Sequence, residues 1–196
     1  RILHEKAVKT DIVYFIPEIE LLSEDQALNE RAVRNILQNY TRSGVFEKMC
    51  IVSNLCLESL SGSTSVYDHY EQLNKIFSNI YYMIDVFTNT KPITSSLRKT
   101  KQQNRIYTIG ISSLSGEHSL LFPLQDTSEI RSHYAINEER LKTDAGLFRK
   151  ITDDVKSKIN EKTKASFGVY STKYEEDYIY TEYYSSKIQE IKTWQY

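Results

Sequence analysis

Tyr70-Glu71-Gln72-Leu73-Asn74 stands near the start of the longest helical pattern in this sequence. Tyr70 and Asn74 are four positions apart, so they lie one turn apart on the same face of a helix. Upstream, Asn54 closes an apolar strand pattern. The ring of Tyr70 offers a stacking surface, and the two carboxamides offer donors and acceptors to the edge of a base. The three residues are therefore a candidate purine clamp.

The helical pattern that contains this stretch covers residues 65–89. Its apolar positions step alternately by three and four, which is typical of a helix with one apolar face. These positions are Tyr70, Leu73, Phe77, Ile80, Ile84 and Phe87. About 25 residues at ~1.5 Å each make a rod of roughly 37 Å, the size of a small domain. We expect a central helix buried between two layers, ended by Lys91-Pro92.

The residues before this helix predict a strand, a helix and a second strand. Residues 11–17 form a continuous apolar run ended by a proline, which indicates a buried strand. Ser23-Glu24-Asp25-Gln26 is a capping-box pattern, and Ser43-Gly44 ends the helix that it opens. Residues 47–53 are a second apolar strand. Because a dozen or more residues separate the strands, we expect a parallel α/β layer.

The residues after the central helix predict a different order. Residues 91–104 are polar and basic, which favours a solvated loop or short helix over a partner-binding patch. We then expect a strand at 105–113, irregular chain at 116–130, a short strand at 133–136, an amphipathic helix at 144–160, and strands at 164–172 and 177–188 joined as a hairpin by a turn at 173–176. Strands outnumber helices here, so this part reads as a small α+β domain.

Composition indicates an ordinary globular chain. It has 196 residues, of which 40% are hydrophobic and 26% charged, with a net charge of −1. Nothing in this balance suggests a nucleic-acid or membrane surface, and the apolar runs are too short to span a bilayer. We expect a cytoplasmic protein with no direct nucleic-acid or membrane partner. Cys50 and Cys56 are interpreted as buried reduced thiols, and no metal site is expected.

Catalytic motifs are missing from this sequence. The six glycines are isolated, so the chain contains neither a P-loop nor a dinucleotide fingerprint. No serine lies in a nucleophile-elbow motif. Asp153-Asp154 and Glu138-Glu139 are adjacent pairs whose side chains point apart, which makes them poor acid–base dyads. We therefore assign no catalytic residue.

The order of these features resembles the tubulin/FtsZ superfamily of filament-forming GTPases. The resemblance rests on strand, helix, strand, Ser53-Asn54, Leu57-Glu58-Ser59-Leu60 and the Tyr-x-x-Leu-Asn pattern at 70–74. In tubulins, the asparagine after the strand and the helix tyrosine and asparagine bind the guanine base. The resemblance assigns stacking to Tyr70 and Watson–Crick edge contacts to Asn54 and Asn74.

Two further stretches extend the resemblance. Ser95-Ser96-Leu97-Arg98-Lys99 resembles the loop after the central helix of tubulins, which implies a longitudinal polymer contact at Ser96, Arg98 and Lys99. Ala165-Ser166-Phe167-Gly168-Val169, followed by a hairpin, resembles the last two strands of the FtsZ C-terminal domain. The composition is closer to the plasmid- and phage-borne TubZ partition proteins, which implies a role in plasmid or phage DNA segregation.

The resemblance implies the C-terminal portion of such a GTPase. The expected fold is α/β: the rear of a parallel-sheet nucleotide domain (1–64), the central helix (65–90) and a small α+β C-terminal domain (91–196). The family's glycine-rich phosphate loop should lie upstream, so the expected partners are a missing N-terminal segment and other copies of the protein. GTP or GDP should bind this chain weakly or not at all, with Mg²⁺ accompanying GTP in the complete protein.

The resemblance also bears on hydrolysis. The family's loop after the central helix carries an acidic residue that acts on the neighbour's nucleotide, whereas residues 91–105 contain no Asp or Glu. Hydrolysis is therefore expected only with the upstream segment, and slowly. The alternative is a non-enzymatic α+β protein-interaction module, in which Tyr70 and Asn74 are core-edge residues. A nucleotide-binding enzyme of another class is disfavoured by the missing phosphate loop.

Overall fold

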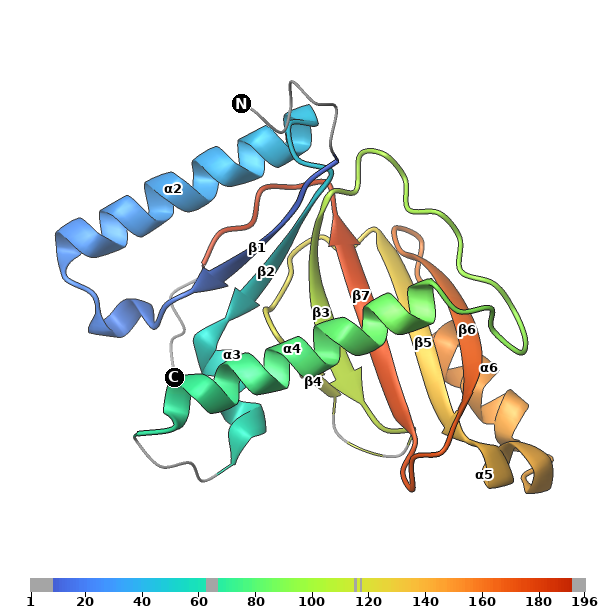
Figure 1. Ribbon diagram of the computed structural model, residues 1–196. Coiled ribbons are helices and arrows are strands. Elements are labelled where there is room, and N and C mark those ends of the chain that lie inside the picture. Colours follow the sequence, from blue (N-terminus) through green and yellow to red (C-terminus); the bar gives the residue numbers. More distant parts are fainter. Residues whose placement is uncertain (1–8, 63–66, 115, 117, 192–196) are drawn as a thin grey trace.

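The structure is a computed structural model that describes residues 9–62, 67–114, 116 and 118–191 (Figure 1). These residues form one seven-stranded sheet in the order β1-β2-β3-β7-β5-β6, with β4 paired to β3. The strands are β1 (Asp11–Ile16), β2 (Lys48–Ser53), β3 (Ile106–Ser112), β4 (His118–Leu120), β5 (Glu129–Asn137), β6 (Lys164–Thr172) and β7 (Tyr178–Ser185). Because only β4 and β7 run against the other strands, the sheet is mostly parallel, and the predicted α/β class is confirmed.

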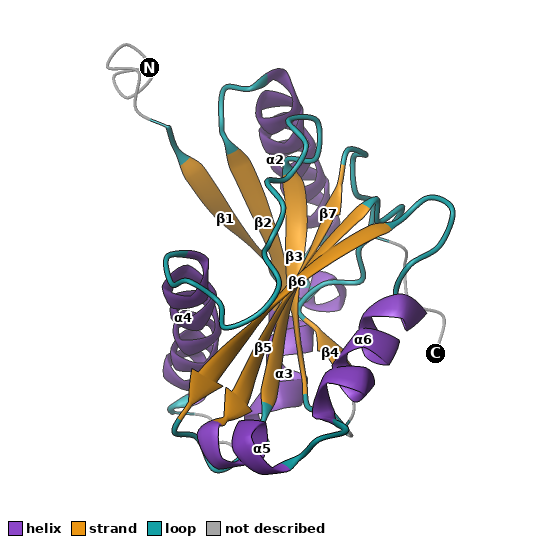
Figure 2. Cartoon of the chain, turned by 90° about the vertical axis from the view of Figure 1, so that its right-hand side faces the viewer, coloured by secondary structure: helices purple, strands orange, loops and turns teal. Residues whose placement is uncertain are grey.

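Helices cover both faces of this sheet (Figure 2). They are the short 3₁₀ helix η1 (Ile19–Leu21), α2 (Glu24–Ser43), α3 (Asn54–Ser61), α4 (His69–Thr88), α5 (Glu138–Thr143) and α6 (Leu147–Ser157). Side chains alternate between the faces of a strand, so Cys50 of β2 packs with α4 whereas its neighbour Ile51 packs towards α2. On β5 and β6 the face opposite α4 packs against α6.

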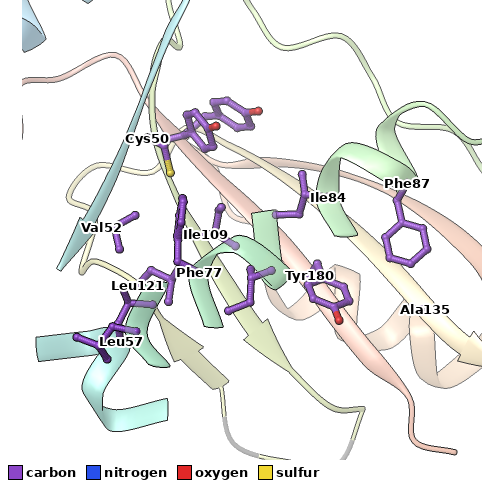
Figure 3. Close-up of a cluster of buried hydrophobic side chains, with 14 of the residues drawn as sticks. Cys50, Val52, Leu57, Phe77, Ile84, Phe87, Ile109, Leu121, Ala135 and Tyr180 are labelled. Carbon is purple, nitrogen blue, oxygen red and sulfur yellow. The ribbon is translucent and has the colours of Figure 1, made fainter. Parts of the chain in front are cut away.

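The apolar face of α4 holds the two halves of the sheet together (Figure 3). Five predicted positions are buried: Leu73, Phe77, Ile80, Ile84 and Phe87. They contact Val52 of β2 at one end and Tyr170 of β6 at the other, in a single cluster. The prediction that Tyr70 belongs to this face is wrong, because its side chain is 71% exposed. The helix also packs on one sheet rather than between two layers, since its outer side is open at Tyr82.

The first half of the chain follows its sequence signals closely. Ser23 caps α2, with its Oγ accepting from the Gln26 backbone N at 3.3 Å and its own N donating to the Gln26 Oε1 at 3.0 Å. Gly44 ends α2 in the left-handed conformation at φ 89°. The predicted α4 is shortened: Tyr67 and Asp68 form a turn, and residues 65 and 66 lie outside the described residues.

The predicted hairpin of the last two strands is wrong. β6 and β7 follow each other in sequence, but β5 lies between them in the sheet. β5 pairs parallel to β6 from Glu129↔Lys164 to Asn137↔Thr172, and antiparallel to β7. Both neighbours of β5 are thus long-range partners. The turn pattern at 173–176 indicates that the chain reverses direction there. It does not indicate which strands β7 then pairs with.

Three shorter elements also differ from the prediction. α3 follows β2 directly, where the sequence suggested only a turn around Cys56. The chain predicted as irregular at 116–130 contains β4 and the start of β5, so β5 is longer than the predicted 133–136.

Cys50 is buried as predicted, whereas Cys56 is only half-buried, and both thiols are free. No helix among the described residues is long and apolar enough to cross a bilayer.

Candidate nucleotide and polymer-contact sites

Asn54 lies at the carboxyl edge of the parallel strands. β1 and β2 end side by side at the pair Ile16↔Ser53, and α3 begins at the next residue, Asn54. The Ser53 backbone N donates to Leu121 O at 2.7 Å, which fixes the chain as it leaves β2. This edge is where open α/β sheets usually bind ligands. Asn54 is half-buried, and its side chain makes no hydrogen bond to another described residue.

Tyr70 and Asn74 both lie at the exposed start of α4. The Tyr70 ring meets the His69 ring edge to face, with centroids 5.2 Å apart. His69 Nδ1 in turn lies 4.0 Å from Glu58 Oε1 of α3, where α3 and α4 pack together (Figure 1). The three predicted base contacts therefore come from two adjacent helices. That their side chains converge on one ligand stays a prediction.

The loop between α4 and β3 is hydrogen-bonded to the edge strand β6. Ile93 N donates to Val169 O at 2.8 Å, and Val169 N donates to Thr94 O at 3.3 Å. Further on, Arg98 N donates to Ser166 Oγ at 3.3 Å. These bonds occupy part of the free edge of the sheet, which would otherwise be open to another strand. The loop is thus exposed in its side chains but held in its backbone.

This loop and the start of β5 and β6 enclose a cavity of about 140 Å³, which we call the basic cavity. It is lined by Arg98, Lys99, Lys101, Ser128, Glu129, Lys164, Ala165 and Ser166. Two of the predicted polymer-contact residues, Arg98 and Lys99, are in this lining, whereas the third, Ser96, is exposed outside it. Glu129 and Lys164 were not predicted, because the pairing of β5 with β6 brings them there from distant positions.

The charges of the basic cavity are unbalanced. Its four cationic side chains face one carboxylate, that of Glu129. The Glu129 Oε2 already accepts from Lys101 N at 3.1 Å and from Asn104 Nδ2 at 3.0 Å. Within the described part of the chain, none of the four cations forms an ion pair, which leaves them available to an anion from outside.

A second group of charges is buried beneath the end of α4. Glu182 Oε2 lies 3.1 Å from His133 Nε2 and 3.4 Å from Arg131 Nη1, while Tyr184 Oη donates to Glu182 Oε1 at 2.5 Å. Burial alone would raise the pKa of Glu182, but the bond to His133 and the charge of Arg131 outweigh it and lower the pKa to about 2. Glu182 is therefore ionised at the centre of the sheet.

Metal ligands are sparse in the same part of the chain. Over residues 9–62, 67–114, 116 and 118–191 no three His, Cys, Asp or Glu side chains come close enough to hold a metal ion. The amides of Asn54 and Asn74 and the exposed ring of Tyr70 are of a kind that can contact the edge and face of a base. The described chain offers no comparable set of groups for Mg²⁺.

Comparison with known proteins identifies the fold. No protein-family model and no curated protein matches the sequence. Among solved structures, the empty FtsZ dimer of M. jannaschii matches 94% of this chain and 57% of its own, with TM-score 0.62 and 14% identity. The GTPγS-form TubZ protofilament of Bacillus thuringiensis serovar israelensis matches 93% and 54%, with TM-score 0.60 and 10% identity.

CetZ from Methanosaeta thermophila strain DSM 6194 is similar to the same degree, with 95% of this chain and 55% of its own covered, TM-score 0.62 and 12% identity. At such identities the likeness establishes the fold and not the activity. The chain spans somewhat more than half the length of these proteins. This chain has the tubulin/FtsZ-like fold that the resemblance in its sequence implied.

Proposed function

We propose that this chain is part of a tubulin/FtsZ-like filament-forming GTPase, to which it contributes guanine-base contacts and longitudinal contacts between subunits. The observation that carries the proposal is the place of Asn54, at the carboxyl edge of β2 and beside the helix that bears Tyr70 and Asn74. It occurs in a fold shared with TubZ, which has been solved as a protofilament.

In this proposal the base is held by three side chains. Tyr70 stacks on the guanine, and the amides of Asn54 and Asn74 bind its Watson–Crick edge. A segment upstream of Arg1 supplies the phosphate contacts and the Mg²⁺ site. Since phosphate contacts contribute much of the affinity for a nucleotide, the chain alone binds GTP or GDP weakly. Residues 1–64 belong to the nucleotide domain, 65–90 to the connecting helix and 91–196 to the second domain.

The polymer contact is assigned to the loop that carries Ser96, Arg98 and Lys99. The basic side chains of this loop face an adjacent subunit of the same protein. Residues 91–105 offer no carboxylate to orient water, so hydrolysis is slow. The protein acts in the cytoplasm, and the segregation of plasmid or phage DNA is the role that suits a TubZ-like filament.

The test uses the full natural protein with GTP, in a pelleting assay and a phosphate-release assay. We expect assembly that requires GTP and turnover that is slow. Asn54→Ala and Asn74→Ala should weaken GTP binding, whereas the matched control Asn79→Ala, exposed on the same helix, should not. A folded protein that neither binds GTP nor pellets would support the interaction-module alternative instead.

A further inference from the structure

Opposite charges gather at the two ends of β6. At its start lies the basic cavity, with Arg98, Lys99, Lys101 and Lys164. At its end, the connection to β7 at 173–177 carries Glu175 and Glu176, and we call it the acidic turn. Figure 1 shows this connection at the lower end of the sheet, whereas the loop after α4 climbs along β6 towards the upper end.

The acidic turn is held in place at its base and is exposed at its tip. Asp177 is buried, where it accepts from the Asn137 backbone N at 2.8 Å and pairs with Arg140. Asn137 Nδ2 donates to Tyr174 O at 2.6 Å. By contrast, Glu175 and Glu176 are exposed, and neither forms an ion pair with a described cation. The tip therefore presents two exposed carboxylates, of which that of Glu176 also accepts a hydrogen bond from Tyr178 Oη at 3.2 Å.

These two charged features cannot meet within one subunit. β6 has nine residues, so its ends are separated by roughly 26 Å at ~3.3 Å per residue. A surface patch that matches a different patch on the same molecule makes a head-to-tail contact, which repeats along a line when the rotation does not close a ring. Charge complementarity at opposite ends of one strand thus favours a linear assembly of identical chains.

We propose that the acidic turn of one subunit docks into the basic cavity of the next, with the carboxylates of Glu175 and Glu176 on Arg98, Lys99, Lys101 and Lys164. This inference rests on the proposed function and names the partner of its polymer-contact loop: a second copy of this chain. An Arg guanidinium binds a carboxylate through two parallel hydrogen bonds, and the lysines add positive charge around it. The cavity of about 140 Å³ admits a glutamate side chain.

Hydrogen bonds also hold the loop that lines the basic cavity. The Arg98 backbone N donates to Ser166 Oγ and the Lys101 backbone N donates to Glu129 Oε2, so the backbone of the loop is held before a partner arrives. Glu129 Oε2 accepts from Lys101 N and Asn104 Nδ2, and Glu129 is the one carboxylate among the four cations of this lining. A loop held in this way loses less backbone freedom on binding than a mobile one.

The test is charge reversal in the full natural protein, read as the critical concentration for pelleting. We expect Glu175→Lys with Glu176→Lys to raise it by about tenfold or more, because like charges now face each other. Arg98→Glu with Lys99→Glu should do the same. Combining all four changes in one chain restores complementarity and should recover most of the lost assembly. The matched control is Glu20→Lys with Glu190→Lys, two exposed glutamates outside both features.

The outcomes separate this inference from the proposed function. Assembly that survives the reversal of the acidic turn, or a four-site variant no better than its parents, overturns the docking while leaving a filament-forming protein. A wild-type protein that does not assemble overturns both. Recovery in the four-site variant supports both, and it cannot arise from misfolding, because two damaging changes would add rather than cancel.

Discussion

Arg131 and Glu182 stand directly opposite each other on β5 and β7, with the Arg131 Nη1 3.4 Å from the Glu182 Oε2. Both side chains are buried, at 8% and 4% exposed. Removing one partner of a buried pair leaves an uncompensated charge, which costs roughly 3–5 kcal/mol. We expect Glu182→Gln to lower the free energy of unfolding by about this amount in urea titration at neutral pH. Exposed Glu71→Gln is the control.

The same carboxylate predicts how stability depends on pH. The pKa of Glu182 is about 2 in the folded chain, below the ordinary value of 4.5. A carboxyl whose pKa is lowered by folding stabilises the protein above its unfolded pKa, and this contribution is lost as the pH falls towards the folded pKa. Between about pH 4.5 and 2, wild type should therefore lose more stability than Glu182→Gln. If wild type and Glu182→Gln lose the same unfolding free energy over this pH range, the lowered pKa of Glu182 is contradicted.

Phe77 is expected to be the most sensitive position of α4. It is 9% exposed, and its ring meets Phe15 of β1 edge to face at a centroid distance of 4.9 Å. Phe77→Ala should cost roughly 3–5 kcal/mol, because it removes buried surface and leaves a cavity. Denaturant unfolding measures this loss. Tyr82→Ala, on the exposed side of the same helix, should change stability by only about 0.5 kcal/mol.

Tyr70 separates base binding from folding. Its ring is 71% exposed, so Tyr70→Ala should leave the unfolding free energy nearly unchanged. If the ring stacks on guanine, the same variant should lose roughly tenfold to a hundredfold in GTP affinity, from about 1–3 kcal/mol of stacking. Tyr70→Phe keeps the ring and should keep most of the binding. Equal affinity for all three proteins, measured by calorimetry on the full natural protein, would remove Tyr70 from the site.

The cap of α2 allows a local test of how this helix is stabilised. Ser23 and Gln26 exchange two hydrogen bonds at the helix start. Ser23→Ala should destabilise the chain by about 1 kcal/mol, since the Gln26 backbone N–H loses its partner. Ser78→Ala, at an exposed interior position of α4, is the matched control and should be neutral or slightly stabilising. Thermal and denaturant unfolding should rank the two variants in this order.

The sequence predicted those elements whose signals are local. The apolar runs of β1 and β2, the Ser23 and Gly44 caps and the buried side of α4 depend on residues close to each other in the chain. The extent of β5 was missed because Glu129 and Arg131 read as surface residues. They can be buried because Asn104 donates a hydrogen bond to Glu129 and Glu182 pairs with Arg131, and both partners are distant in sequence. Long-range compensation of this kind leaves no local pattern.

The candidate sites were predictable to different degrees. Asn54, Tyr70 and Asn74 were selected from spacing, and the structure places them on adjacent helices. Arg98 and Lys99 were selected from the resemblance of residues 95–99 to a tubulin loop, and they do line a cavity. Lys164 was not selected, because it enters that cavity only through the register Glu129↔Lys164 between two strands. Knowledge of the sheet order was required to find it.

The position of β7 has a consequence for how the chain is made. β7 follows every other described strand in the sequence, yet it lies between β3 and β5 and pairs the β1-β2-β3 half of the sheet with the β5-β6 half. Until Tyr178–Ser185 has emerged, no described strand pairs the two halves, so β3 and β5 each have an open edge. The sheet can therefore close only after residue 185 has been synthesised. A ribosome that stops before residue 178 releases a product with exposed edges, which is prone to aggregate.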